Sequence, residues 1–199
     1  MSSNSLDRWS APASLTAGGL WLLIWLHQRA AHGLTALNER RLLLGLTWMD
    51  SAKFLVLPLL LVSVGLASLC FRRKHAGLLG SAGAAVTGVG LALLTLGVAL
   101  EFWSFPWGSY AVAFEDAELA RVGGMLQALA SLVFAAGLVA FTIDLVRARE
   151  LAVWAAAVLV LGGLTTFFLT PVNALPGVAW LLLGIVLWRR PSRNRPRRT

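Results

Sequence analysis

The chain has 199 residues, of which 58% are hydrophobic and only 13% are charged, and its mean hydropathy is +0.75. A soluble domain of this length has too little interior for so much apolar surface, so the composition excludes an ordinary water-soluble protein and indicates lipid as the solvent. The formal net charge is +8, but the basic residues stand mostly at the ends of apolar runs. This placement favours orientation in a membrane over nucleic-acid binding.

Apolar runs divide the chain into six predicted membrane spans. A hydrocarbon core of about 30 Å requires roughly 20 apolar residues in an α-helix. By that measure the spans are 11–26, 53–71, 76–100, 122–143, 151–170 and 174–188. We therefore predict an all-α polytopic transmembrane helix bundle that forms a single domain, residues 1–188. A basic tail, 189–199, follows it and is expected to be disordered because it has no apolar residue that could dock.

The first span leaves an alternative open. Residues 11–26 are slightly short for a full crossing, and the loop 27–52 after them carries Arg29, Arg40 and Arg41. Apolar residues in this loop fall near helical spacing, which favours an interfacial amphipathic helix, and the alternative is an extension of the next span. If residues 11–26 do not cross the bilayer, the protein has five spans.

Charge predicts the orientation. With six spans both termini lie on one side, and that side holds 12 of the 17 Lys and Arg residues. Because cytoplasmic segments carry the excess of basic residues, the prediction is N-in/C-in. The arginines of the tail are expected to contact anionic lipid headgroups. The single cysteine, Cys70, excludes an intrachain disulfide.

Small residues recur at four-residue intervals in the third and fourth spans. They are Gly80, Ala84, Gly88 and Ala92 in the third span, and Gly124 and Ala128 in the fourth. Residues four apart share a helix face, and small side chains let membrane helices approach closely. We predict that the third and fourth helices pack through these faces at the centre of the bundle, so that leucine at Gly88 disrupts the protein more than leucine at Gly90.

The third span ends in the aromatic turn Glu101-Phe-Trp-Ser-Phe-Pro-Trp107. Since Trp is enriched at headgroup level, the first interpretation is an interfacial belt. The alternative is a lip, fixed by Pro106, over a cavity that receives a lipid-like or otherwise apolar ligand. The candidate ligand-binding residues are Glu101, Trp103, Phe105, Trp107 and, about one turn into the fourth span, Gln127.

The sequence lacks the residue constellations of common enzymes and metal proteins. Its three histidines, His27, His32 and His75, lie at the ends of spans or in loops, outside any spaced metal motif. No serine in a span has a histidine placed to act as its base, and no phosphate-binding glycine loop occurs. We therefore expect no catalytic residue, no metal and no cofactor. An enzyme acting on a lipid would have to gather Glu101, Glu115, Asp116 or His75 at one interface.

The segments ELAVWAAAVLVLGG, residues 150–163, and LPGVAWLLLGIVLWRR, residues 175–190, resemble the closing helical hairpin of small, uncharacterised multi-pass membrane proteins that are common in bacteria. The resemblance implies a bacterial inner membrane and about six helices. It carries over no catalytic or binding residue.

These observations favour a non-enzymatic protein that serves as a structural or accessory subunit or binds apolar, lipid-like molecules. One alternative is a small transporter or channel, which would need a polar path lined by residues such as Gln127, Thr87 and Thr95. The other is a membrane enzyme that acts on a lipid. The expected partners are membrane lipids, together with another membrane protein or a second copy of the chain, and not nucleic acid.

Overall fold

The computed structural model describes residues 9–34, 46–72, 77–107, 118–166 and 173–189, and these residues form helices with no β-strand among them. In chain order the helices are α2 (Ser10–Leu34), α3 (Trp48–Lys53), α4 (Val56–Arg72), α5 (Leu78–Trp103), α6 (Glu118–Arg147), α7 (Val153–Thr165) and α8 (Leu175–Trp188). The predicted all-α class is confirmed.

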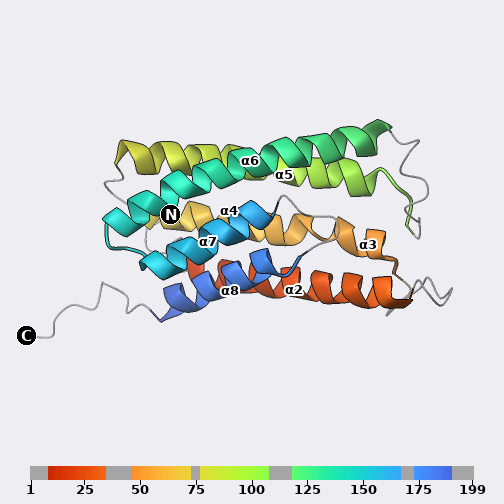
Figure 1. Ribbon diagram of the computed structural model, residues 1–199, viewed down its shortest axis with the longest axis horizontal. Coiled ribbons are helices and arrows are strands. Elements are labelled where there is room, and N and C mark those ends of the chain that lie inside the picture. Colours follow the sequence, from red (N-terminus) through yellow and green to blue (C-terminus); the bar gives the residue numbers. More distant parts are fainter. Residues whose placement is uncertain (1–8, 35–45, 73–76, 108–117, 167–172, 190–199) are drawn as a thin grey trace, which may run out of the picture.

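The helices lie along a common axis in three layers (Figure 1). The long pair α5 and α6 forms one outer layer, α2 and α8 form the other, and α4 and α7 lie between them. Successive passes along the axis alternate in direction, so α2 begins and α8 ends at the same end of the bundle.

Three helical stretches are long and apolar enough to cross a membrane: Met49–Cys70, Leu78–Trp103 and Glu118–Arg147. They correspond to the second, third and fourth predicted spans. With 26 residues, α5 is about 39 Å long and exceeds a hydrocarbon core of about 30 Å. Large apolar side chains on the outside of α5 and α6, such as Val89, Leu96 and Leu129, are exposed. A membrane location accounts for this surface.

The first predicted span corresponds to a longer helix. Instead of ending near residue 26, α2 continues to Leu34 and includes His27, Gln28 and Arg29. Part of the predicted loop 27–52 is therefore helical in continuity with the first span. Residues 35–45 of that loop lie outside the described part of the chain.

The fifth and sixth predicted spans correspond to short helices. With 13 and 14 residues, α7 and α8 are each about 20 Å long, shorter than a hydrocarbon core. Asn173 joins their ends, since its Nδ2 donates to the Thr165 carbonyl at 2.7 Å and its Oδ1 accepts from the Leu175 N–H at 3.1 Å. The Asn173 carbonyl accepts from Trp21 Nε1 at 2.9 Å. Because Trp21 lies near the middle of α2, Asn173 and the two helix ends that it joins lie near the middle of the bundle.

The most extensive helix contact joins α5 to α6, the pair that the small residues predict, but it uses a different face. The pair also lies in an outer layer and not at the centre of the bundle, where it was predicted (Figure 1). A Cβ atom added to Gly83, Gly90 or Gly97 would overlap α6, and one added to Gly123 or Gly137 would overlap α5. These glycines are spaced by seven or fourteen residues along each helix, and Ala130, midway between the last two, is fully buried.

The predicted four-residue register of this contact is therefore corrected. Each step of four residues turns about 40° around a helix, whereas a step of seven turns back only about 20°. The set drifts off the contact accordingly: Gly80 is buried, Ala84 is half-buried, and Gly88 and Ala92 are exposed. A Cβ atom on Gly88 would meet nothing within 4 Å. On α6, Gly124 and Ala128 are half-buried at the edge of the contact.

Candidate functional site

A kink at Phe54 and Leu55 separates α3 from α4, and Pro58 accounts for it. Proline has no N–H, and its ring collides with the carbonyl four residues earlier, here that of Phe54. The Leu57 N–H donates to the Phe54 carbonyl at 3.0 Å instead of reaching back to Lys53. The Lys53 carbonyl is thereby free to accept from the indole Nε1 of Trp103 at 3.1 Å.

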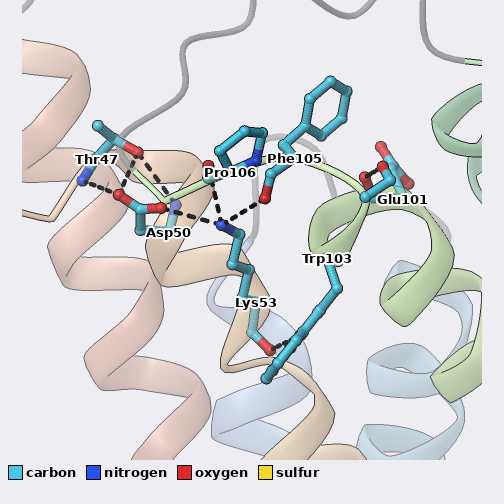
Figure 2. Close-up of polar contacts among 8 residues, drawn as sticks. Thr47, Asp50, Lys53, Glu101, Trp103, Phe105 and Pro106 are labelled. Carbon is cyan, nitrogen blue, oxygen red and sulfur yellow. Dashed lines mark hydrogen bonds and ion pairs between the residues drawn. The ribbon is translucent and has the colours of Figure 1, made fainter.

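The Lys53 side chain is the centre of a buried polar cluster (Figure 2). Only 2% of the residue is exposed, and its Nζ donates to Asp50 Oδ1 at 3.3 Å and to the carbonyls of Phe105 at 3.0 Å and Pro106 at 3.3 Å. The ammonium also lies 4.3 Å from the centroid of the Trp107 ring. We call these contacts the Lys53 latch. A buried ammonium is tolerated when it is paired in this way.

Asp50 links the latch to the start of α3. Its Oδ2 accepts from the Thr47 N–H at 3.0 Å and from the Thr47 hydroxyl at 2.9 Å, and the Thr47 hydroxyl accepts from the Asp50 N–H at 3.2 Å. This is a capping box. The spacing Thr47-x-x-Asp50-x-x-Lys53 could have indicated both the cap and the ion pair, but the sequence interpretation took Lys53 only as the start of a span.

The aromatic turn contacts Lys53 through its backbone carbonyls and its tryptophan rings. Trp103 and Trp107 are more than half exposed, and their ring centroids are 6.4 Å apart. Phe105 points inward and packs with Met49 and Ala120. The two indoles are exposed near the C-terminal end of α5, and the turn is fixed to α3 by hydrogen bonds.

Glu101 and Gln127 form a separate pair between α5 and α6. Both are buried, and Gln127 Nε2 donates to Glu101 Oε2. The structure therefore divides the predicted ligand-binding set: Glu101 and Gln127 meet each other in the helix contact, whereas Trp103, Phe105 and Trp107 contact Lys53.

A groove between α2 and the kink was not anticipated from the sequence. It has a volume of about 210 Å³. Its lining residues are Leu20, Leu23, Ile24, His27, Leu46, Ser51, Phe54 and Leu57. Phe54 connects the groove to the aromatic turn, because its ring centroid lies 5.9 Å from that of Trp107. We refer to this feature as the α2–kink groove.

His27 and Ser51 are the polar residues among the described residues that line the groove, and His27 differs in having no hydrogen-bond partner. Both of its ring nitrogens are shielded from solvent, and neither has a hydrogen-bond partner. The sequence interpretation placed the histidines at span ends or in loops; His27 instead lies within α2, which continues for seven residues beyond it. The helical spacing of residues 20, 23, 24 and 27 could have indicated that three apolar side chains and His27 share one face of the helix. It could not have indicated what that face contacts.

Other predicted groups fall outside the described residues: Glu115, Asp116, His75 and all of the basic tail except Arg189. Thr87 and Thr95 donate to carbonyls of their own helix, those of Gly83 at 2.6 Å and Leu91 at 2.8 Å. Within the described part of the chain, no three His, Cys, Asp or Glu side chains gather as a metal site. Comparisons with protein-family models, with curated proteins and with solved structures found no match.

Proposed function

We propose that the protein is a non-enzymatic multi-pass membrane protein that binds a lipid-like molecule in the α2–kink groove. The observation that carries the proposal is the groove, whose lining, among the described residues, is apolar except for His27 and Ser51. Binding sites for small molecules are typically lined in this way, by apolar side chains with a few polar groups.

The size of the groove limits the ligand. Pockets for drug-sized molecules have volumes of roughly 300–1,000 Å³, and the groove, at about 210 Å³, is smaller. A single acyl or alkyl chain suits this volume better than a molecule with two chains. The proposed ligand is therefore one slim apolar molecule that enters from the surrounding lipid.

The proposed setting is the inner membrane of a bacterium, with both termini in the cytoplasm. Of the six predicted spans, the first four cross the membrane as α2, α4, α5 and α6, and the last two, α7 and α8, enter it as a hairpin without crossing. The three helices that can span a membrane support the setting, and the distribution of 12 of the 17 basic residues to one side supports the orientation. In this arrangement the α7–α8 hairpin enters the bilayer from the cytoplasmic side, and Asn173 pairs within it with the Thr165 carbonyl and the Leu175 N–H.

A matched pair of substitutions on α2 tests the proposal. Leu23 and Leu26 are 62% and 54% exposed, but only Leu23 lines the groove. Tryptophan at Leu23 should fill the groove, whereas tryptophan at Leu26 should leave it open. Native mass spectrometry of protein released from nanodiscs should show a bound single-chain lipid on the wild type and on L26W, and its loss from L23W. Equal retention by both variants would overturn the proposal.

One observation favours transport as a second candidate function. The Glu101 carboxyl is buried in a helix that can span a membrane, and ionisable groups in such positions often belong to ion pathways. If Glu101 serves transport, Glu101→Gln should abolish a proton or ion flux measured in proteoliposomes while leaving lipid retention intact. Absence of any flux from the wild-type protein would remove this candidate.

A further inference from the structure

Resting on the proposed function, we infer that the α2–kink groove selects single-chain lipids whose head is an uncharged hydroxyl group, and that His27 recognises this head. The inference goes beyond the presence of an apolar ligand, because it assigns the polar end of the ligand and the side chain that contacts it.

The His27 side chain lacks hydrogen-bond partners that a buried imidazole normally has. A neutral imidazole carries one N–H donor and one acceptor nitrogen, and both nitrogens of His27 are shielded from solvent without a hydrogen bond. Buried polar groups in folded proteins are nearly always paired, since an unpaired group keeps its desolvation cost. Neither nitrogen is accessible in the ligand-free protein, so the imidazole must turn toward the groove to meet a ligand that supplies the missing partner. Such a ligand gains affinity because the hydrogen bond removes the cost of the unpaired group.

The chemistry of the lining favours an uncharged head. Among the described residues that line the groove there is no Lys or Arg, so none of them compensates a carboxylate or phosphate. Lys53 is a buried cation that lies in sequence between Ser51 and Phe54, two residues of the groove lining. Its ammonium already donates to Asp50 and to two carbonyls of the aromatic turn. Transfer of an unpaired ion into apolar surroundings costs far more than transfer of a hydroxyl group. A hydroxyl also both donates and accepts, so it can pair with either tautomer of His27.

The apolar and polar ends of the groove are arranged as the chain and head of a membrane lipid are. Leu20, Leu23 and His27 lie on one stripe of α2, and they extend about 10 Å along the helix. The Leu20 end adjoins Trp21, which lies near the middle of the bundle and donates to the Asn173 carbonyl. His27 is closer to the end of α2. A ligand with its head at His27 therefore directs its chain toward the bilayer centre.

Competition between three probes tests the inference. The full-length protein in nanodiscs is cross-linked to a photoactivatable alkyl diazirine, and dodecanol, dodecane and dodecanoate compete for the groove. We expect dodecanol to compete about tenfold better than dodecane, a difference that corresponds to one hydrogen bond. His27→Phe should remove this difference while retaining competition by dodecane.

Spectroscopy of the wild-type protein makes the test independent of whether that variant folds. With ¹⁵N-labelled histidine, dodecanol should shift the imidazole nitrogens of His27, and dodecane should not. Equal competition by dodecanol and dodecane without such a shift would overturn the role of His27, and strongest competition by dodecanoate would overturn the uncharged head. In both cases the groove would still bind an alkyl-chain probe, and the proposed function would stand. If none of the three probes competed, the proposed function itself would fail.

Discussion

At the scale of single residues, the most extensive helix contact, between α5 and α6, depends on which glycines face the neighbouring helix. Composition and spacing identified the correct pair of helices but not the register, because a four-residue repeat remains on one face for only a few turns. The structure replaces it with the repeat Gly83, Gly90, Gly97, which faces α6 throughout. The sequence predicted that α5 and α6 contact each other through small residues, but it did not predict which face of each helix makes the contact.

Leucine substitutions at Gly90 and Gly88 test this register. Gly90→Leu should lower the free energy of unfolding by roughly 1–3 kcal/mol or more, because its side chain would overlap the Phe134 backbone. Gly88→Leu should be tolerated, since its Cβ meets nothing within 4 Å. Denaturation by SDS in mixed micelles measures both variants. Similar losses at the two positions would contradict the assigned face.

Arg149 offers a second prediction at the residue scale. Its φ is 56°, in the left-handed region, and it ends α6 in a Schellman motif: the Glu150 N–H donates to the Leu145 carbonyl at 2.8 Å and the Arg149 N–H to the Val146 carbonyl at 2.9 Å. Arg149→Gly should raise the free energy of unfolding by about 0.5–1 kcal/mol, because glycine removes the backbone strain. Arg147→Gly, within the helix, should lower it by a similar amount. Thermal unfolding in detergent compares the two, and a loss of stability in R149G would refute the prediction.

At the scale of elements, the decisive feature is the kink between α3 and α4. Pro58 is visible in the sequence, and so is a capping box around Thr47 and Asp50. Neither reveals that the freed Lys53 carbonyl accepts from Trp103 or that the Lys53 ammonium reaches the carbonyls of Phe105 and Pro106, because these partners lie about 50 residues away in the chain. Long-range contacts of this kind leave no local pattern.

Removal of the Lys53 latch should release the aromatic turn. Lys53→Met keeps much of the apolar stem but leaves two backbone carbonyls and Asp50 without the ammonium. Each buried group left unpaired costs about 1–3 kcal/mol. Hydrogen exchange of residues 101–107 should therefore accelerate at least tenfold. Arg147→Met removes an exposed cation elsewhere and serves as the control. Unchanged protection of the turn in K53M would show that the latch does not hold it.

At the scale of the whole molecule, the membrane class follows from composition alone, because 58% hydrophobic residues cannot be buried by a chain of this size. The number of full crossings does not follow, since α7 and α8 are shorter than the apolar runs that contain them. The groove could not be predicted either. It arises where residues 20–27 of α2 pack beside residues 46–57, and its volume depends on the kink between them.

The central claim is that the α2–kink groove receives a lipid-like molecule, and the position of cross-links tests it most directly. An alkyl diazirine is activated in nanodiscs that contain the wild-type protein, L23W or L26W, and the labelled residues are mapped by peptide mass spectrometry. We predict that adducts concentrate on Leu20, Leu23 and Leu57 in the wild type, persist on Leu20 and Leu57 in L26W and disappear from those two positions in L23W. Labelling spread evenly over the exposed apolar surface of α5 and α6, with no enrichment at the groove and no effect of L23W, would contradict the claim.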